Sequence, residues 1–290
     1  MEGKVLSNIN GTYSIYTPTQ IFKTKSRGVI RNKKQKIEVG DNVVFNPTLN
    51  VIENILERKN YIIRPSIANI DLLLVVESIK EPLFSYLLTF KHLTYANKNE
   101  IPFLLVISKI DNEDDYKKYL DIKNVFSSLG VEILPSSKFN QNYINSIKEK
   151  IKGKTICLLG QSGAGKSSLI NLIDENFSRD VGEYSKALGR GKHKTKEVVL
   201  LPYLDGFIAD TPGFSSLDLM CYKEELAIYF PGFQDYNKCF YPSCLHISEN
   251  KCYIKNELNN GKIPKIAYDC YLKLSSEAIF KKERFNKHEK

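Results

Sequence analysis

The chain has 290 residues, of which 42% are hydrophobic and 26% are charged, a composition that excludes a wholly disordered protein. Its 42 basic and 33 acidic side chains give a formal net charge of +9. No apolar run approaches the roughly 20 residues of a membrane span, and the N-terminal segment lacks the apolar block of a secretory signal. We therefore expect a cytoplasmic protein without membrane segments. Six cysteines are too few for a disulfide scaffold, so their spacing is considered for metal binding.

The N-terminal segment has the pattern of short strands joined by turns. Runs that alternate or are rich in β-branched residues are separated by turn signals such as Asn10-Gly11 and Asn46-Pro47. Five short strands in about 60 residues fit a small barrel, for which an oligonucleotide-binding barrel (OB-fold) is one option. The predicted strands are residues 4–9, 12–16, 29–32, 42–46 and 51–57.

From residue 70, apolar strand-like runs alternate with helical patterns, which is typical of a parallel sheet covered by helices. The predicted strands are residues 70–78, 102–108, 131–135, 155–160, 196–203 and 206–210. The predicted helices are residues 82–97, 113–129, 139–151, 222–229 and a Lys-rich 264–286. We expect three domains, at residues 1–66, 67–230 and 231–290.

A glycine-rich segment fits the phosphate-loop pattern G-x-x-x-x-G-K-[ST]. It reads Gly160-Gln161-Ser162-Gly163-Ala164-Gly165-Lys166-Ser167 and is followed by Ser168. The segment lies between a predicted strand and a predicted helix, where glycines let successive backbone N–H groups point at phosphate oxygens. We expect Lys166 to reach the β- and γ-phosphates of a nucleotide and Ser167 to bind Mg²⁺.

Asp210-Thr211-Pro212-Gly213 follows the last predicted strand of the central region. We expect Asp210 to hold Mg²⁺ through water and the Gly213 N–H to contact the γ-phosphate. Between this segment and the phosphate loop lies a basic, glycine-rich stretch, residues 189–195, in which Thr195 would complete the Mg²⁺ shell. The alternative interpretation of this stretch is a solvated basic loop.

Base specificity is predicted from a third segment, which consists of Ser108, Lys109, Ile110 and Asp111. A carboxylate at the end of a strand can accept two hydrogen bonds from N1–H and N2–H₂ of guanine, for which adenine has no matching donors. The stem of Lys109 would lie over the base. Ser136, Ser137 and Lys138 follow the next predicted strand and would close the base pocket from the other side.

The order of these segments is unusual, because Asp111 precedes Lys166 by 55 residues, whereas the phosphate loop comes first in an ordinary GTPase. With this order, the motifs GQSGAGKSSLIN, GRGKHKT and DTPGFSSL resemble the ribosome small-subunit-dependent GTPase A family (RsgA, YjeQ, YloQ) over nearly the whole chain. The resemblance implies an α/β, circularly permuted P-loop GTPase domain. It also implies a flanking N-terminal OB-fold β-barrel and a C-terminal zinc-binding helical domain.

Two positions depart from the motifs usual in that family. Ser108 stands where Asn is common, which we expect to weaken nucleotide affinity while Asp111 keeps the guanine preference. The switch segment reads His193-Lys194-Thr195 where His-Thr-Thr is common, which keeps the Mg²⁺-binding Thr195 and adds a cation.

Cys239, Cys244, His246 and Cys252 lie within 14 residues. Three thiolates and one imidazole suit tetrahedral Zn²⁺, and a closed four-ligand site is structural because it leaves no position for water. The same Cys-Cys-His-Cys series is a feature of the family. The alternative is a set of unrelated free thiols. The other three cysteines, Cys157, Cys221 and Cys270, lack such clustering, and we interpret them as buried or incidental thiols.

The residue after Gly213 is Phe214, which cannot orient a water molecule as the Gln of many GTPases does. We therefore expect slow hydrolysis by the protein alone. His193 is the candidate catalytic residue, and the resemblance implies that the small ribosomal subunit activates it. The alternative is that His193 contacts RNA or caps the loop.

The net charge is +6 for residues 1–66, −1 for residues 67–230 and +4 for residues 231–290. Two basic arms around a neutral domain favour contact with a polyanion. The alternative is a set of solvated lysine faces. The resemblance implies a monomeric GTP hydrolase that binds GTP and GDP and acts late in assembly and maturation of the small (30S) ribosomal subunit, contacting its rRNA. The alternative is a GTP-dependent RNA-binding module with little hydrolysis and a non-ribosomal target.

Overall fold

A computed structural model describes residues 1–26, 36–63, 66–175, 177, 198–210 and 221–280. The chain divides into two compact units. The first comprises Met1–Leu73, Asn145–Leu158 and Ser167–Phe214. The second comprises Leu74–Ile144, Leu159–Lys166 and Ser215–Lys290. In the described part of the chain, no helix is both long and apolar enough to cross a membrane.

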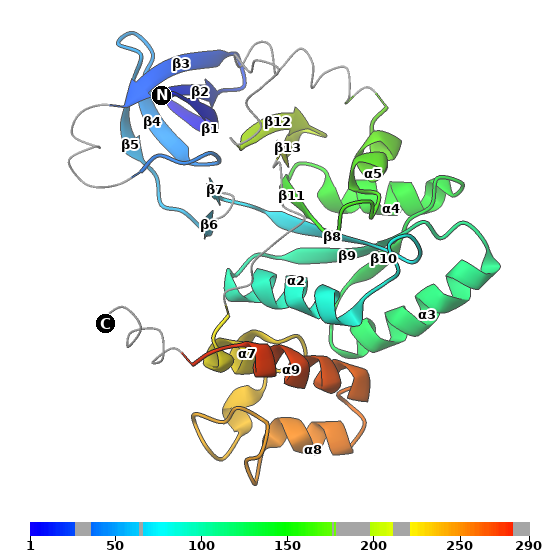
Figure 1. The fold of residues 1–290 in the computed structure, drawn as a ribbon. Coiled ribbons are helices and arrows are strands. Elements are labelled where there is room, and N and C mark those ends of the chain that lie inside the picture. The colour runs from blue at the N-terminus through cyan, green and yellow to red at the C-terminus, as the bar shows by residue number, and fades with distance from the viewer. Residues whose placement is uncertain (27–35, 64–65, 176, 178–197, 211–220, 281–290) are drawn as a thin grey trace. The chain divides into compact units, whose positions relative to one another are not determined.

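The N-terminal strands form a closed five-stranded barrel in the order β1-β2-β3-β5-β4 (Figure 1). The strands are β1 (Glu2–Ile9), β2 (Thr12–Tyr16), β3 (Ile21–Ser26), β4 (Asn42–Asn46) and β5 (Val51–Ile55). β3 and β5 pair in parallel, and the other neighbours pair antiparallel. The turn between β1 and β2 has positive φ at Asn10 and Gly11, as a two-residue hairpin requires.

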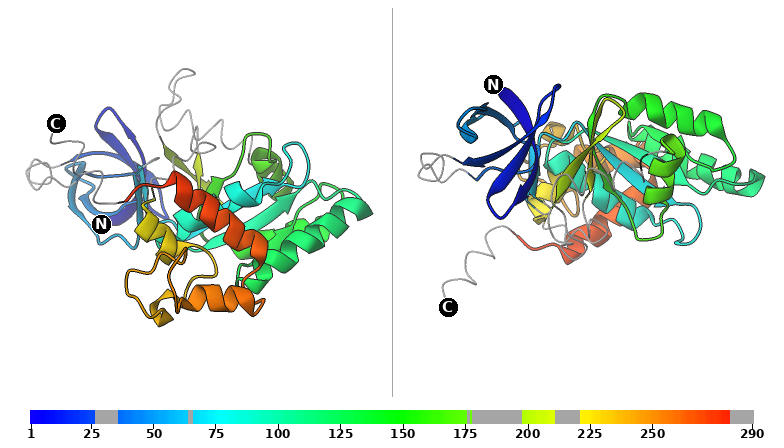
Figure 2. Two further views of the ribbon diagram at one scale, coloured as in Figure 1. Left: turned by 60° about the horizontal axis from the view of Figure 1, so that its bottom comes forward. Right: turned by 90° about the horizontal axis from the view of Figure 1, so that it is seen from above.

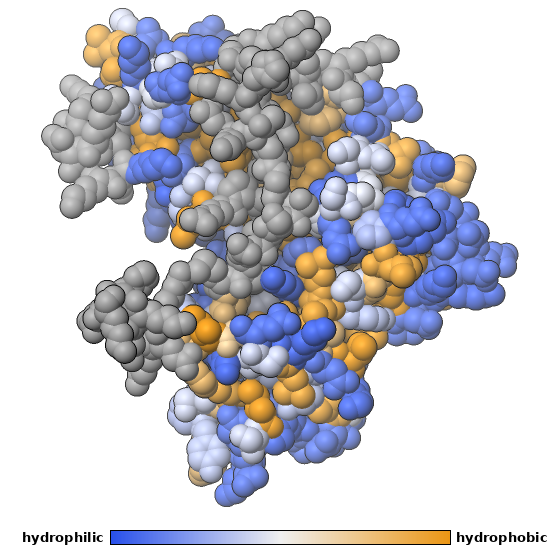
Figure 3. All heavy atoms as spheres, viewed as in Figure 1, coloured by the Kyte–Doolittle hydropathy of each residue, from blue (hydrophilic) through white to orange (hydrophobic). Residues whose placement is uncertain are grey.

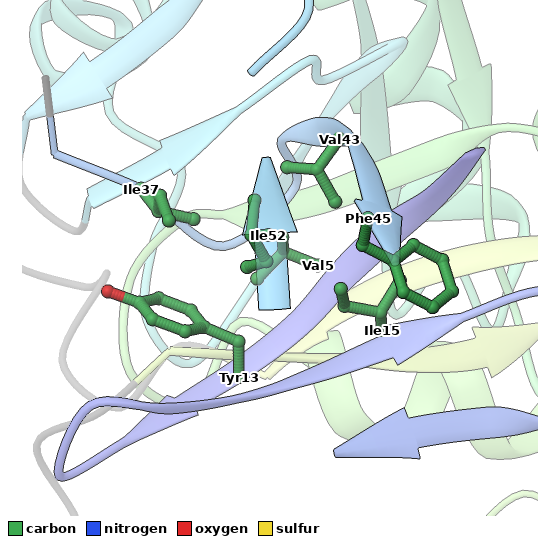
Figure 4. Packing of buried hydrophobic residues seen from close by; sticks show 7 residues of the cluster. All are labelled: Val5, Tyr13, Ile15, Ile37, Val43, Phe45 and Ile52. Carbon is green, nitrogen blue, oxygen red and sulfur yellow. The ribbon is translucent and has the colours of Figure 1, made fainter. Parts of the chain in front are cut away.

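Alternating apolar residues of these strands fill the interior of the barrel (Figure 4). Val5, Ile15 and Phe45 are fully buried there. Gly3 is needed for close packing, because a Cβ at this position would lie 2.4 Å from Cγ2 of Ile15 and 2.7 Å from the Tyr16 carbonyl oxygen. The predicted N-terminal barrel is therefore confirmed.

The sequence did not predict β3, which is one of the barrel strands. The strand expected at residues 29–32 lies outside the described residues. β3 has the sequence IFKTKS and fully buries only Thr24, so the apolar alternation that marks a strand is missing. After the barrel, β6 (Tyr61–Ile63) and β7 (Ser66–Ala68) form a small antiparallel sheet.

The central region contains a six-stranded sheet in the order β10-β9-β8-β11-β13-β12. The strands are β8 (Leu72–Ser78), β9 (Phe103–Ser108), β10 (Ile133–Pro135), β11 (Thr155–Leu159), β12 (Val199–Tyr203) and β13 (Gly206–Asp210), all close to their predicted positions. β8 is buried at every residue, which explains its continuous apolar pattern. β12 runs antiparallel to β13 because Leu204 and Asp205 join the two strands in a tight turn with positive φ.

Four helices belong to the same region: α2 (Tyr86–Lys98), α3 (Glu113–Ser128), α4 (Gln141–Ile151) and α5 (Lys166–Ile173). α3 begins at Asn112, whose side chain accepts a hydrogen bond from the Asp115 N–H at 2.9 Å. Three acidic residues in the first turn stabilise the helix, because negative charge interacts favourably with the N-terminal end of the helix dipole. Its outer face is hydrophilic in Figure 3.

The C-terminal part contains α7 (Lys223–Tyr229), a short 3₁₀ turn (Tyr236–Lys238), α8 (Tyr253–Asn259) and α9 (Lys265–Glu277). α7 and α9 pack on α2, as Figures 1 and 2 show. The Phe230 ring stacks on Phe90 with 4.9 Å between centroids and lies 5.4 Å from Tyr271. Lys98 pairs with Glu225 at 2.8 Å.

The last helix was predicted too long. α9 ends at Glu277, residues 278–280 are extended or irregular, and residues 281–290 lie outside the described part. The Ile279 carbonyl accepts a hydrogen bond from the Lys223 N–H at 3.1 Å, and Lys223 Nζ lies 4.7 Å from the centroid of Phe280. Ile279 and Phe280 therefore contact the start of α7 and do not continue the helix. α8, within the predicted Cys-rich loop, was not predicted.

Candidate nucleotide site and metal centre

The phosphate-loop segment joins β11 to α5, as predicted. Gly160, Gly163 and Gly165 have φ values of 138°, 79° and 89°, which L side chains rarely adopt. A Cβ at Gly160 would lie 1.9 Å from the Val76 carbonyl oxygen, so only glycine lets the loop start this close to β8. The sequence thus produces the compact backbone that phosphate binding requires.

Lys166 folds back over this loop. Its Nζ donates hydrogen bonds to the carbonyl oxygens of Gly160 and Gln161, both at 2.7 Å. Burial lowers the pKa of Lys166, and the Glu77 carboxylate opposes that shift. The ammonium group is therefore held at the mouth of the loop, where a phosphate oxygen would be a stronger partner than either carbonyl.

The phosphate loop is tied directly to the predicted guanine segment. The Ser108 hydroxyl donates a hydrogen bond to the Ala164 carbonyl oxygen at 2.6 Å, and Ser108 is 4% exposed. Ser108 stands at the end of β9, so the bond joins the ends of two strand-loop segments that are distant in the sequence. The structure therefore brings together two sets of residues that we predicted to form one site.

Asp111, three residues after Ser108, makes polar contacts with both of its carboxylate oxygens. Its Oδ1 accepts a hydrogen bond from Ser137 Oγ at 3.1 Å, and its Oδ2 lies 3.4 Å from Lys80 Nζ. Lys80 Nζ also pairs with Asp115 Oδ2 at 2.7 Å. Asp111 and Ser137 line a groove of about 570 Å³. Sequence analysis missed Lys80 and Asp115, because no motif includes them; the available signal was the position of Lys80 just after a buried strand.

The two predicted base-binding segments lie side by side. The Ile110 N–H donates to the Ser136 carbonyl at 3.1 Å, and Ser136 is 3% exposed. Lys138 Nζ lies 4.8 Å from the centroid of Phe139. Lys109 has a φ of 64°, and its Nζ donates a hydrogen bond to the Glu81 carbonyl. The placement of the Lys109 stem over a base stays a prediction.

The remaining predicted site residues belong to the Mg²⁺, γ-phosphate and catalytic sets. His193, Thr195 and Gly213 lie outside the described residues, as does the side chain of Asp210. The backbone of Asp210 ends β13, as predicted. Ser167 and Ser168 lie in the first turn of α5.

The four predicted metal ligands form one cluster. The ligand atoms of Cys239, Cys244, His246 and Cys252 all lie within 4.8 Å of one another. Cys239 Sγ is 3.9 Å from Cys252 Sγ and 3.5 Å from His246 Nδ1. Tetrahedral Zn²⁺ with ordinary bond lengths requires about 3.8 Å between sulfur atoms and about 3.6 Å between sulfur and nitrogen. The cluster can therefore hold a metal ion.

Neighbouring groups orient these ligands. His246 Nε2 lies 3.0 Å from the Ala227 carbonyl oxygen, a contact that places the ring proton on Nε2 and leaves Nδ1 free to bind a metal. The backbone N–H groups of Tyr253 and Lys255 donate to Cys239 Sγ and Cys252 Sγ, at 3.3 and 3.5 Å. These contacts hold the two sulfur atoms in position within the cluster.

Comparisons with known proteins point to one family. The RsgA GTPase family matches residues 55–220, and the RsgA N-terminal domain matches residues 2–51. The chain belongs to the RsgA GTPase family. An RsgA of Halalkalibacterium halodurans, named "Small ribosomal subunit biogenesis GTPase RsgA", is 38% identical over 283 residues, covering 95% of this chain and 96% of the relative. A Clostridium botulinum protein of the same name is 37% identical over 284 residues, covering 96% and 98%.

Two solved structures of RsgA-type proteins are similar to this one. YjeQ from Thermotoga maritima has a TM-score of 0.82 at 34% identity and covers 95% of this chain and 97% of its own. YloQ, described as a circularly permuted GTPase, has a TM-score of 0.78 at 28% identity and covers 95% and 94%. The barrel, the central α/β GTPase domain and the Cys₃His cluster with its helices confirm the predicted RsgA fold. The predicted GTPase class is also confirmed.

Proposed function

We propose that this protein hydrolyses GTP as a late assembly and maturation factor of the small (30S) ribosomal subunit. The observation that carries the proposal is a match over at least 95% of the chain to proteins named small ribosomal subunit biogenesis GTPases. The hydrogen bond between Ser108 and Ala164 supports it, because it joins the guanine segment to the phosphate loop in permuted order.

In this proposal the nucleotide binds along the segments described above. Lys166 and the N–H groups of the phosphate loop contact the phosphates, and Asp111 accepts hydrogen bonds from guanine. Ser167, Thr195 and Asp210 offer hard oxygen ligands, which suit Mg²⁺, and this ion would neutralise charge on the phosphates. The full GTP-binding set is residues 108–111, 136–138, 160–168 and 213.

His193 is proposed as the residue that orients the attacking water when the small subunit is bound. The sequence reason is Phe214, which occupies the position of the usual Gln and cannot bind water. The test is GTP turnover of His193→Ala with and without small subunits. We expect normal GTP binding but no stimulation, whereas normal stimulated turnover would contradict the catalytic role.

The remaining proposals concern domains, metal and partners. We propose a barrel at residues 1–66, a GTPase domain at 67–230 and a Zn²⁺-stabilised segment at 231–290, acting together as a cytoplasmic monomer. The basic terminal domains, with net charges of +6 and +4, would contact small-subunit rRNA. The Cys₃His donor set suits Zn²⁺ because thiolate and imidazole are its preferred ligands.

Sedimentation with purified ribosomal subunits tests the partner. With a non-hydrolysable GTP analogue, we expect the protein to travel with small subunits and to be released when GDP replaces the analogue. Large subunits serve as the control. Sedimentation alone with either nucleotide would instead favour a GTP-dependent RNA-binding module with another target.

A further inference from the structure

Lys80 occupies the loop that follows β8, and neither the phosphate loop nor the predicted guanine segment includes it. Its ammonium group lies 2.7 Å from Asp115 Oδ2 and 3.4 Å from Asp111 Oδ2. The Lys80 side chain is 39% exposed, whereas the Asp115 side chain is 7% exposed. One cation thus bridges two carboxylates, and one of these is the carboxylate proposed to recognise guanine.

The backbone on both sides of this bridge is fixed. The Lys80 N–H donates to Ser78 Oγ at 3.2 Å, and Ser78 is 1% exposed. The neighbouring carbonyl of Glu81 accepts a hydrogen bond from Lys109 Nζ. On the other side, the Asp111 N–H donates to Asp115 Oδ2 at 3.2 Å. The loop is therefore attached to the guanine segment by its side chain and by its main chain.

Each oxygen of Asp111 has a different partner. Ser137 Oγ donates to Oδ1 at 3.1 Å, and Lys80 lies near Oδ2. A single contact at one oxygen leaves a carboxylate free to rotate about its last bond, whereas contacts at both oxygens fix the plane. Guanine recognition needs that plane, because N1–H and N2–H₂ must each meet one oxygen.

Charge gives a second reason for the bridge. Asp111 and Asp115 approach the same ammonium group, so without Lys80 two like charges would face each other and repel. Hydrogen bonding to Asp115 raises the pKa of Lys80, and hydrogen bonding to Lys80 lowers the pKa of Asp115. Lys80 and Asp115 therefore both stay charged at neutral pH.

We propose that Lys80 is a positioning residue for base recognition, which holds the Asp111 carboxylate in the orientation that accepts both guanine donors. This inference rests on the proposed guanine-binding role of Asp111. It predicts a specific effect when Lys80 is changed. Recognition of the 2-amino group of guanine should weaken more than the affinity for the nucleotide as a whole.

The experiment compares guanosine diphosphate with inosine diphosphate, which lacks the 2-amino group. Binding of each nucleotide with Mg²⁺ to the full chain is measured by calorimetry for wild type, Lys80→Met and Lys80→Arg. Lys123→Met, on the exposed face of α3, is the control for loss of a lysine. Circular dichroism establishes that each variant folds, and Lys80→Gln replaces the methionine variant if that one does not.

We expect the preference for guanosine over inosine diphosphate to fall roughly tenfold in Lys80→Met, which is the order of one hydrogen bond to a charged group. Lys80→Arg should restore most of it, and Lys123→Met should match wild type. An unchanged preference, even with weaker binding of both nucleotides, would overturn the proposal, as would an arginine variant no better than methionine. A wild-type chain that does not distinguish the two nucleotides would overturn the guanine-binding role of Asp111, and the role of Lys80 with it.

Discussion

The Ser108 hydroxyl donates a hydrogen bond to the Ala164 carbonyl oxygen at 2.6 Å. Through this bond the end of β9 holds the phosphate loop, although the two residues are 56 positions apart. Ser108 stands where Asn is common in the family, and its short side chain makes a direct link to the phosphate loop.

Changing Ser108→Ala removes this link and leaves the buried Ala164 carbonyl without that donor. A neutral hydrogen bond contributes about 1 kcal/mol, so GDP affinity should fall about fivefold. Titration calorimetry measures the change. Ser128→Ala is the matched control, because Ser128 Oγ also donates to a carbonyl, that of Val125 at 2.8 Å, but at the exposed end of α3. Equal affinities for wild type and Ser108→Ala would show that the link does not order the loop for binding.

Changing Asp111→Asn should convert the base preference from guanine to xanthine. The amide offers one donor and one acceptor, which match the 2-oxo group and N1–H of xanthine but not the two donors of guanine. We expect a loss of roughly 100-fold or more in GDP affinity and a gain for xanthosine diphosphate. Competition binding of the two nucleotides measures both changes. Unaltered GDP binding would exclude Asp111 from the base site.

The Cys₃His cluster predicts about one equivalent of tightly bound zinc per chain. Cys244→Ala should leave the chain with less than stoichiometric zinc and a lower melting temperature, because metal binding contributes folding free energy to this segment. Elemental analysis and thermal unfolding measure the two effects. Cys270→Ala is the control, since Cys270 lies on α9 outside the cluster. Equal zinc content in both variants would contradict the assignment.

The contacts of the Asp71 carboxylate should stabilise the folded protein in a pH-dependent way. Burial raises its pKa, but hydrogen bonds from Lys59 and from the Thr155 N–H at 2.7 Å outweigh this and leave the pKa below its usual value of 3.8. Because the folded pKa is lowered, the stabilisation is complete above about pH 4 and disappears as pH falls through the lower folded value. Because solvent screens a carboxylate that is 37% exposed, Asp71→Ala should lower the free energy of unfolding by at most about 1 kcal/mol at pH 7.

Urea unfolding at pH 7 and below pH 4 measures the difference between Asp71→Ala and wild type. The difference should shrink at the acidic pH. Asp121→Ala, on the exposed face of α3, should unfold like wild type at both pH values. A difference that grows on acidification would contradict the assigned sign.

Local patterns predicted much of this fold and site. β8 and β9 are buried on both faces, so continuous apolar runs identify them in the sequence. The phosphate loop and the metal ligands could be predicted because each set lies within one short segment of the chain. β3 could not be predicted because only Thr24 of its six residues is fully buried. Its place depends on pairing with β2 and β5, which a local pattern does not encode.

The features missed at the site have the same cause. Lys80 meets Asp115 across 35 positions, so only the folded sheet brings these two groups together. The end of α9 likewise depends on the contact of Ile279 with Lys223, 56 residues earlier in the chain. Residue types mark which groups can act, whereas their mutual distances arise from tertiary structure.

GTP turnover in the presence of purified small ribosomal subunits tests the central claim most directly. The protein alone should hydrolyse GTP slowly, because Phe214 cannot orient the attacking water. Added small subunits should raise the turnover by about 100-fold or more, the order that one positioned catalytic side chain contributes, and large subunits should not. Turnover that is the same with small subunits, large subunits and neither would contradict the proposed function.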